Sequence, residues 1–386
     1  MTHRVLTGAR KFAEHELLPR TDEFDTLADE PPFALYRRFH QAGLAHWWLP
    51  EHHGGPGLGL EQSVDVVSEL AYGDAGTAFT LLVPYTGSLM VQLFGTDELH
   101  RRYVLPMAAS GGFCALAGSE HEAGSELGRT ATTAALDGDH IVLNGVKAFS
   151  TCADFADYLL VLARDATEPG VFHTVLLPRR TPGVRIVKRW PVIGLRSSWT
   201  YEVALTECRV PADHLLRGNG LRILESGINA LRILIGATTV GVARRIRDLC
   251  MDYAADKRLG DGTLLDNAVF AARLGQMEIQ IDVMRNQCLS AARTLDTVLA
   301  RPDAAAELLR QGTLRSAVAT KMFCGQTGWD IASTASEMFG GLGYTEELPL
   351  GKLMRDIRYA SILDGGDDVL RQLVYNRYVL PAFRRI

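Results

Sequence analysis

Near its C-terminal end the chain reads RDIRYASILDGGDD, residues 355–368, and the rest of the sequence is best interpreted outward from this stretch. The apolar pair Ile362 and Leu363 leads into a single carboxylate, Asp364, which two glycines follow. Glycine frees the backbone of such a turn, and the preceding element aims the side chain. The pattern fits a general base held over a substrate carbon. It equally fits one helix ending before another begins, which is the simpler interpretation of the stretch alone.

The composition describes a globular protein with more than one domain. Of 386 residues, 47% are hydrophobic and 22% are charged. One ordinary core does not accommodate that length, so two or three domains are expected. The net charge of -5, with the two signs interspersed, gives no reason to propose nucleic acid as a partner.

The sequence favours a cytoplasmic location without a membrane anchor. The N-terminal residues form an amphipathic pattern and contain no apolar signal-peptide core. The longest apolar run, residues 231–242, is about half of the roughly 20 residues that a membrane span needs. The cysteines are scattered without a CxxC pair, as expected for reduced thiols and not for a disulfide framework or zinc site. His52 and His53 have no partnering His or Cys pattern, so no metal site is expected.

The spacing of apolar residues divides the chain into helices, then strands, then helices again. Residues 1–112 have apolar positions at intervals of three and four, which predicts an N-terminal all-α domain. Residues 113–217 contain short alternating runs and predict a small antiparallel β-domain, a sandwich or a barrel. Within it, Asp137-Gly138-Asp139 and Asn144-Gly145 are expected to form hairpin turns.

Residues 218–386 are predicted to form a C-terminal four-helix bundle. Long helical patterns joined by short connections are typical of such a bundle. The expected helices are 220–256, 264–300, 304–340 and 367–382. Within the first of them, Arg244 and Arg245 are interpreted as a solvated helix face. The predicted fold class is therefore α+β, in the order helical domain, antiparallel β-domain and helical bundle.

Five groups of short motifs occur in register over nearly the whole chain. They are Glu51-x-x-Gly54-Gly55-x-Gly57-Leu58 with Ser68-Glu69-Leu70-Ala71-x-x-Asp74; Ser119-Glu120-x-x-Ala123-Gly124-Ser125-Glu126; Asn144-Gly145-x-Lys147-x-Phe149-Ser150-Thr151; Gly194-Leu195-Arg196-Ser197 with Cys208-Arg209-Val210-Pro211; and Phe339-Gly340-Gly341-Leu342-Gly343-Tyr344 with Arg355-Asp356 and Asp364-Gly365. Together they resemble the acyl-CoA dehydrogenase superfamily of flavoproteins. The resemblance implies that family's fold and FAD as the cofactor.

The resemblance assigns contacts with FAD to residues of the β-domain. A flavin ring needs hydrogen-bond partners at N5, O4 and its pyrimidine edge, because those atoms carry the charge of the reduced anion. Ser119 and Thr151 stand at the family positions with this role. Phe149 stands where the family places an aromatic residue, usually Trp, against the isoalloxazine. Gly124 and Ser125 would offer backbone and hydroxyl donors to the pyrophosphate.

Asp364 matches the family position of the catalytic base, which is usually Glu. The resemblance implies that it removes the pro-R α-proton of an acyl thioester, while the β-hydrogen leaves as hydride to flavin N5. It also implies an oxyanion hole formed by the backbone N–H of Asp364 and a ribityl hydroxyl, with Gly365 beside the substrate. Some family members carry the base before an Arg that matches Arg232. Leu231 precedes it here and cannot act as a base. For Arg232 itself, a place in the active-site wall and an ion pair across the bundle both stay open.

The sequence departs from the family pattern at the base and at the adenine end of the FAD site. Asp is shorter than Glu by about one C–C bond, roughly 1.5 Å, and a misplacement of that size can cost about two orders of magnitude in rate. Acidic residues near a diphosphate would repel it, and Lys257 and Arg258 are expected to offset that repulsion. The other FAD positions that the resemblance implies are Arg258, Glu337, Gly340, Gly341, Gly366 and Asp368.

The expected function is α,β-dehydrogenation of an acyl thioester carried by CoA or by an acyl carrier protein, with specialised, polyketide-type metabolism as the expected setting. An electron-transfer flavoprotein or a similar acceptor would reoxidise the flavin, and a homodimer or homotetramer would complete the FAD sites. Two alternatives stay open. The Asp-Gly-Gly sequence also resembles nitroalkane oxidase, which uses oxygen, and the acidic residues of the adenine end fit a non-catalytic relative that has lost FAD.

Overall fold

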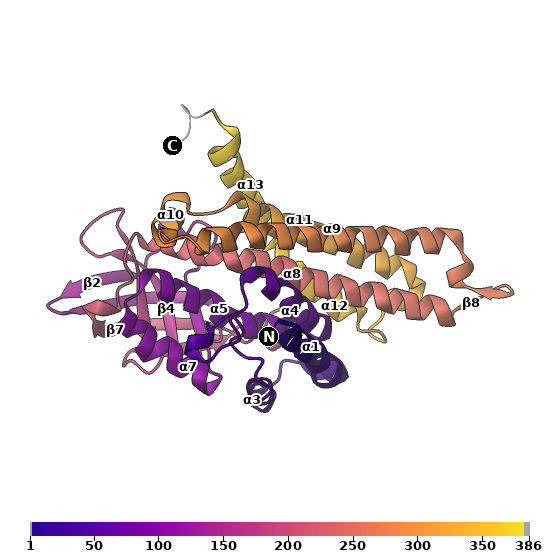
Figure 1. The fold of residues 1–386 in the computed structure, drawn as a ribbon, viewed down its shortest axis with the longest axis horizontal. Coiled ribbons are helices and arrows are strands. Elements are labelled where there is room, and N and C mark those ends of the chain that lie inside the picture. Colours follow the sequence, from indigo (N-terminus) through magenta and orange to yellow (C-terminus); the bar gives the residue numbers. More distant parts are fainter. Residues whose placement is uncertain (1, 382–386) are drawn as a thin grey trace.

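The structure, a computed structural model, describes residues 2–381 and has three successive parts (Figure 1). The N-terminal part is helical, the middle part is a sheet, and the C-terminal part consists of long helices that lie side by side. This order confirms the predicted α+β class. The principal N-terminal helices are α1 (Thr2–Phe12), α3 (Phe33–Gln41), α4 (Leu60–Gly73), α5 (Ala75–Phe94) and α7 (Leu105–Ser110).

The middle part is a seven-stranded sheet in the order β1-β4-β2-β3-β7-β6, with β5 added to β4. Most neighbours are antiparallel, as expected, but β1 and β2 each run parallel to β4. The strands are β1 (Cys114–Ala117), β2 (Thr133–Asp137), β3 (His140–Thr151), β4 (Tyr158–Asp165), β5 (Phe172–Pro178), β6 (Val184–Arg189) and β7 (Thr200–Pro211).

One of the two predicted hairpin turns is wrong. Asp137 and His140 flank a turn between β2 and β3, as expected. Asn144-Gly145 instead lies within β3, at a shift in its pairing with β7. Glycine is required there by a close approach, because a Cβ on Gly145 would lie 2.3 Å from Thr132 Oγ1. The dipeptide therefore marks a β-bulge.

The C-terminal helices differ from their predicted bounds mainly at two places. Residues 304–340 form two helices, because Gly312 turns the chain with a φ of 63°. The buried Asn229 bonds to both sides of this break, at 2.8 Å to the Gly312 carbonyl and at 2.8 Å from the Leu314 N–H. An additional helix, α12, was not predicted. The elements are α8 (Gly220–Asp256), β8 (Arg258–Leu259), β9 (Gly262–Thr263), α9 (Ala268–Leu299), α10 (Ala304–Gln311), α11 (Arg315–Met338), α12 (Leu350–Arg358) and α13 (Asp367–Val374).

The last predicted helix, 367–382, is shorter than expected. Helix α13 ends at Val374 and continues as one π-helical turn, Tyr375–Val379, while residue 382 lies outside the described residues. This segment projects away from the bundle in Figure 1.

Two helices are more apolar than the sequence analysis recognised. Helices α5 and α8 each contain an 18-residue window with a mean hydropathy of 1.3, long enough to cross a membrane by composition. In the fold, 83% of the α5 window and 100% of the α8 window are buried. Small polar residues interrupt the apolar run of α8, which is why the run looked too short. Both helices form core of the folded chain.

The interpretation of Arg244 and Arg245 as a solvated face is also wrong. Arg245 is buried and donates to the carbonyl oxygen of Gly73 at 2.9 Å and to Thr21 Oγ1 at 2.7 Å. Arg244 donates to the buried Glu69 at 3.1 Å. Both side chains therefore join α8 to the N-terminal helices.

A buried group of charges connects all three parts of the chain. Lys352 Nζ of α12 contacts Asp74 Oδ1 at 2.7 Å and Asp356 Oδ2 at 2.5 Å. Asp74 begins α5 by accepting from Thr77 N at 2.7 Å, and it also accepts from Ser197 Oγ in the connection between β6 and β7. Asp356 in turn accepts from Leu195 N at 2.7 Å. The N-terminal helices, the sheet and α12 thus meet at one ammonium group.

We predict that Lys352→Met lowers the free energy of unfolding by about 3–5 kcal/mol, because it leaves two buried carboxylates without their cation. Urea unfolding followed by far-UV circular dichroism measures the change. Arg209→Met is the matched control, since its ion pair with Asp137 is largely exposed and should leave the midpoint nearly unchanged. Equal midpoints for wild type and Lys352→Met would show that this contact does not hold the parts together.

Candidate active site

The candidate base lies on a tight turn between α12 and α13. A short 3-10 turn, Tyr359–Ser361, leads to Asp364, and α13 begins at Asp367. Asp364 has a φ of 52° and Gly365 a φ of 98°, so two consecutive residues are left-handed. A Cβ at position 365 would lie 2.9 Å from Leu370 Cδ2. The turn therefore requires glycine at position 365, both for its dihedral angle and for space.

The left-handed backbone at Asp364 gives a physical reason for a short carboxylate. Residues other than glycine rarely have a positive φ, and Asp is several-fold enriched among those that do. Its short polar side chain can bond locally in this conformation. The sequence suggested that only the glycines free the backbone of this turn, whereas the candidate base Asp364 itself has the unusual backbone. Asp in place of Glu fits this turn.

The environment of Asp364 suits a proton acceptor. The residue is half-buried, and its Oδ2 has no hydrogen-bond partner among the described residues. Burial raises the pKa of Asp364 above its ordinary value, while the positive charges of Arg232 and Lys321 act in the opposite direction. A partly desolvated carboxylate of this kind is a stronger base than one in water.

Arg232 binds the backbone of this turn and not the carboxylate. From α8, its Nε and Nη2 donate to the carbonyl oxygen of Asp364 at 3.0 and 2.7 Å. The side chain is buried, and burial lowers the pKa of Arg232 to about 10. Its Nη1 has no partner among the described residues. A positive charge therefore lies directly behind the candidate base. This arrangement fits the interpretation in which Arg232 belongs to the active-site wall.

A loop of the sheet reaches the same turn. The N–H of Gly366 donates to Ser125 Oγ at 3.2 Å, which joins the predicted pyrophosphate loop to the turn of the base. A Cβ at Gly124 would meet no atom within 4 Å, so the neighbouring space is open. The structure thus brings Gly124, Ser125 and Gly366 together with Asp364.

Phe149 presents an exposed aromatic face at an irregular part of β3. Its φ is 54°, at the shift in pairing between β3 and β7. Phe149 is 55% exposed. Its ring stacks on that of Trp190, with centroids 4.7 Å apart and an interplanar angle of 29°. Strained backbone and an exposed aromatic side chain in one residue are typical of a binding position.

Ser119 and Thr151 lie near Phe149 along the sheet. Ala148 N donates to the Ser119 carbonyl oxygen at 2.9 Å, which holds Ser119 beside β3. Thr151 Oγ1 lies 3.0 Å from Thr200 Oγ1, and each hydroxyl retains further hydrogen-bonding capacity. An exposed ring, hydroxyl groups and an open loop at Gly124 fit a flavin nucleotide.

Asp368 lies in α13, four residues after Asp364, whereas the other four remaining predicted FAD residues lie at the distant end of the bundle. Arg258 is in β8, and Glu337, Gly340 and Gly341 are at the end of α11. Tyr253 and Phe339, with ring centroids 4.8 Å apart, bring these two ends together. Along α8 this end is about 36 Å from Arg232, at roughly 1.5 Å per residue. The structure therefore does not bring these four residues to Asp364 within one chain.

Two of the acidic residues predicted to repel a diphosphate have arginine partners. Glu337 pairs with Arg273 at 3.3 Å, and Asp368 pairs with Arg371 at 2.5 Å. Both pairs are exposed, so their charges are largely compensated in place. The expected repulsion at the adenine end is correspondingly weaker.

The sequence matches three models of one family along the chain. They are the acyl-CoA dehydrogenase N-terminal domain over residues 2–111, the middle domain over residues 115–208 and the C-terminal domain over residues 218–379. The chain belongs to the acyl-CoA dehydrogenase family. FAD, which the motifs implied, is confirmed as the cofactor of this family.

Known acyl-CoA dehydrogenases match the chain over nearly its whole length. The probable acyl-CoA dehydrogenase FadE25 of Mycobacterium tuberculosis is 28% identical over 97% of this chain and 94% of its own. The human mitochondrial short-chain specific acyl-CoA dehydrogenase is 28% identical over 99% of this chain and 91% of its own. The structure of a Bacillus anthracis acyl-CoA dehydrogenase complexed with FAD superposes with a TM-score of 0.90 at 23% identity, over 98% of this chain and 66% of that one.

A buried ion pair between Lys147 and Glu120 supports the segment that is predicted to face the flavin. Both residues occur in the sequence motifs, but the motifs assigned them no role. Lys147 Nζ contacts Glu120 Oε1 at 2.7 Å and the Gly118 carbonyl oxygen at 3.0 Å. Burial lowers the pKa of Lys147 to about 8. Burial opposes ionisation of Glu120, but the Lys147 ammonium outweighs it and lowers the pKa of Glu120 to about 2. Because Glu120 follows Ser119 and Lys147 precedes Phe149 by two residues, the pair lies beside both residues that are predicted to contact the flavin.

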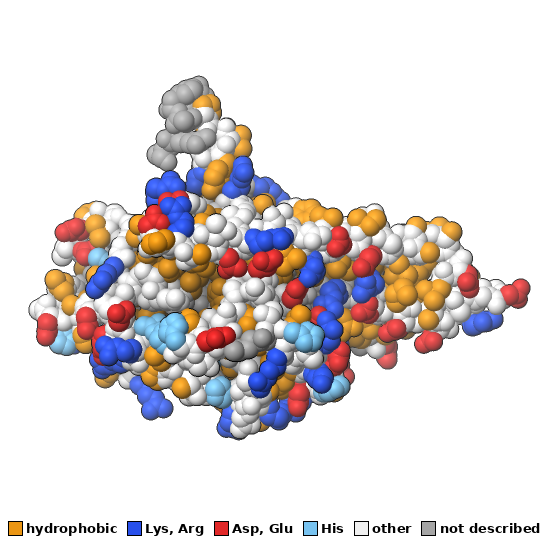
Figure 2. All heavy atoms as spheres, viewed as in Figure 1, with side chains coloured by type: hydrophobic (Ala, Val, Ile, Leu, Met, Phe, Trp, Pro, Cys, Tyr) orange, Lys and Arg blue, Asp and Glu red, His pale blue; other side chains and the backbone are white. Residues whose placement is uncertain are grey.

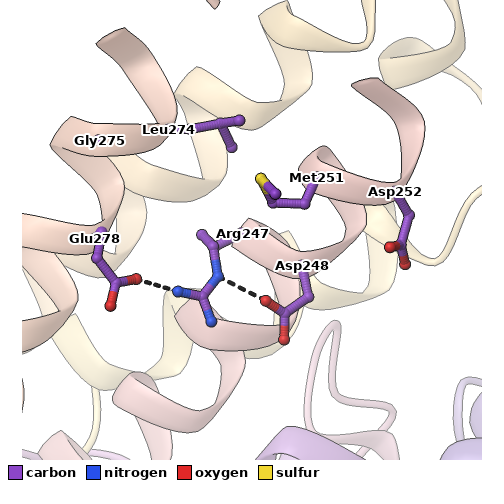
Figure 3. A pocket seen from close by; sticks show the side chains of 7 residues that line it. All are labelled: Arg247, Asp248, Met251, Asp252, Leu274, Gly275 and Glu278. Carbon is purple, nitrogen blue, oxygen red and sulfur yellow. Dashed lines mark hydrogen bonds and ion pairs between the residues drawn. The ribbon is translucent and has the colours of Figure 1, made fainter. Parts of the chain in front are cut away.

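A surface cavity of about 450 Å³ lies elsewhere, between α8 and α9. Figure 3 shows Arg247 between the carboxylates of Asp248 and Glu278, with Met251 and Leu274 beside them. Arg247 is 15 residues from Arg232 along α8, roughly 22 Å at 1.5 Å per residue. The cavity contains none of the predicted site residues, and its cation is already paired.

We predict that Glu120→Gln reduces both the bound flavin and the stability, because it leaves the Lys147 ammonium buried without a counter-charge. Without Glu120 the pKa of Lys147 falls below about 8, so the Lys147 side chain of the variant loses its charge as the pH rises. Its deficit in melting temperature should therefore shrink between about pH 6 and about pH 8. Glu122→Gln, at an exposed neighbouring position, is the control. A deficit that does not change with pH would contradict the assigned pair.

Proposed function

We propose that the chain is an FAD-dependent dehydrogenase that introduces a double bond between Cα and Cβ of an acyl thioester, with Asp364 as the base. The observation that carries the proposal is the Asp364 carboxylate, which is half-buried, has an unpartnered Oδ2 and lies on a turn bound by Arg232. Family membership supports the reaction class. CoA is the default carrier, and an acyl carrier protein is the alternative.

The chain's own groups perform the proton transfer. Asp364 accepts the α-proton, and the positive charge of Arg232 keeps the carboxylate ionised before it does so. The backbone N–H of Asp364 donates to no other described residue, which leaves it available to the thioester carbonyl. Such a donor stabilises the negative charge that forms as the proton leaves. When bound, FAD would accept the β-hydrogen as hydride. Ser119, Gly124, Ser125, Phe149 and Thr151 would hold the cofactor.

We predict that Asp364→Asn retains FAD but loses substrate-dependent bleaching of the flavin by at least about two orders of magnitude, because the amide cannot accept the proton. Asn tolerates the left-handed backbone, so the turn should persist. Stopped-flow absorbance with acyl-CoA and acyl-carrier-protein thioesters measures the rate and selects the carrier. Asp364→Glu separately tests how the length of the side chain that carries the carboxylate affects the bleaching rate. Wild-type bleaching in Asp364→Asn would place the base elsewhere.

The electron acceptor separates this function from that of a nitroalkane-oxidase-like enzyme. A dehydrogenase needs an electron-transfer flavoprotein or a dye, whereas the oxidase consumes oxygen without either. The sequence Asp364-Gly365-Gly366 is the feature on which the resemblance to the oxidase rests. Oxygen uptake in the absence of an added acceptor would favour the oxidase. A purified protein that cannot be reconstituted with FAD would favour the non-catalytic alternative.

The protein also acts, in this proposal, as a homodimer or homotetramer in the cytoplasm. The distant group of Arg258, Glu337, Gly340 and Gly341 would complete the FAD site of a second copy, because it lies too far from Asp364 in its own chain. Figure 2 shows hydrophobic side chains gathered on the end of the bundle nearest β8. Buried, unpaired cysteines support a reducing compartment.

We predict that Ile279→Glu with Val283→Glu disrupts the assembly and lowers the FAD content, because these α9 residues are 61% and 45% exposed. Light scattering should give a multiple of 42.3 kDa for the wild type and a lower multiple for the variant. Leu136→Glu, at an apolar position of the sheet that is 73% exposed, is the control and should assemble normally. A wild-type monomer with a full complement of FAD would refute the shared site.

A further inference from the structure

A second buried cation holds the turn of the base from the side opposite the sheet. Lys321 lies on α11, and its Nζ donates to the carbonyl oxygen of Gly365 at 2.7 Å and to Asp367 Oδ1 at 3.1 Å. Its side chain is completely buried. Burial lowers the pKa of Lys321, while the carboxylates of Asp367 and Asp364 raise it. A buried ammonium is costly, so its retention beside the base calls for a reason.

The contact acts on one peptide group with a partner on each side. The carbonyl of Gly365 points to Lys321, and the N–H of Gly366 in the same peptide donates to Ser125 Oγ. A peptide group is planar, so the direction of its carbonyl sets the direction of its N–H. Lys321 therefore couples the turn of the base to the loop assigned to the FAD pyrophosphate.

Helix α11 also approaches the turn closely enough to transmit this restraint. A Cβ on Gly325, one helical turn after Lys321, would lie 3.2 Å from the Ala360 carbonyl carbon. The charged groups near Asp364 are Arg232 from α8 and Lys321 from α11, and Tyr359 from the preceding turn is a titratable but neutral neighbour whose pKa burial raises. Glu225 and Arg377 act on Arg232, and Asp367 of α13 acts on Lys321.

We infer that Lys321 is a positioning residue for the proposed reaction: it orients the Gly365–Gly366 peptide and, with Arg232, balances the charge of the base. Arg232 holds the carbonyl of Asp364 and Lys321 holds the next carbonyl, so each of the two left-handed residues has its own cation. Among the described residues, Lys321 Nζ bonds to the Gly365 carbonyl oxygen and to Asp367, and not to the Asp364 carboxylate. Its effect on catalysis passes through Asp364. The inference rests on the proposed function.

The first test is the pH profile of kcat/KM for Lys321→Met, which removes the charge and keeps most of the length. Losing a nearby positive charge makes Asp364 harder to ionise, so the acidic limb of the profile should move up by about one pH unit. The plateau rate should fall about 10- to 100-fold, because the turn is no longer fixed. A role confined to stability would lower the folded fraction without moving the limb.

Two further variants keep the inference testable if Lys321→Met does not fold. Lys321→Arg retains the charge, so its acidic limb should stay at the wild-type pH even if the plateau rate falls. Asp367→Asn keeps the shape but removes the opposing charge, so its limb should move to lower pH. Gln326→Ala, which removes the other partner of Asp367 at 3.2 Å, is the control and should match the wild type. An unmoved limb in both Lys321→Met and Asp367→Asn would overturn the inference.

A second readout separates failure of this inference from failure of the proposed function. Incorporation of deuterium at Cα of an acyl thioester in D2O, measured by mass spectrometry, reports the base without requiring net oxidation. If the wild type exchanges and Lys321→Met exchanges with the same rate and pH profile, only the role of Lys321 fails. If the wild type neither exchanges nor bleaches with any acyl thioester, the proposed function fails. In that case, infrared titration of the carboxylate, with Asp364→Asn as the blank, decides the inference. It survives if Lys321→Met raises the pKa of Asp364, and it fails if that pKa is unchanged.

Discussion

The Lys352 ammonium is the point on which the arrangement of the chain depends. It is buried between Asp74, which begins α5, and Asp356, which belongs to α12, while Ser197 and Leu195 bring the sheet to the same carboxylates. Burial makes these charges expensive alone, so they are tolerated only when all partners are in place. The group therefore favours one relative placement of the three parts. Helix α12 leads directly to Asp364, and the placement of the base against the sheet follows from that contact.

The turn of the base repeats the same principle on a smaller scale. Its two left-handed residues are unfavourable in isolation, and each directs a carbonyl oxygen to a buried cation on a different helix. The Gly366 N–H bonds to Ser125 of the sheet. Restraints from α8, α11 and the sheet thus converge on three consecutive residues. Such a turn has little freedom to move when substrate binds, which preorganises the carboxylate and the free N–H of Asp364.

Much of this arrangement could be predicted from the sequence, because it is encoded by local patterns. Apolar spacing predicted α8 almost to its ends, and motif order predicted the succession of helix, sheet and helix. The break at Gly312 was missed because its support, Asn229, is 83 residues distant along the chain. Asn144-Gly145 was misassigned because a bulge and a hairpin turn use the same dipeptide, and only the nearby Thr132 distinguishes them. Lys321 could not be identified as a site residue from the sequence. A lysine in a helix is usually solvated, and the contact of Lys321 with Gly365 forms only in the tertiary structure.

The same reasoning changes the meaning of Asp364. As a sequence departure it looked like a base with an arm shorter than that of Glu by about one C–C bond. In the structure the residue has a φ of 52°, so its Cβ leaves the chain in a different direction from that of a right-handed or extended residue. Adding one methylene to this backbone would extend the carboxylate along the new direction. The shorter side chain, the left-handed turn and the glycine at position 365 are therefore mutually consistent. The position of the carboxylate is a property of the whole turn, and Arg232 and Lys321 maintain it.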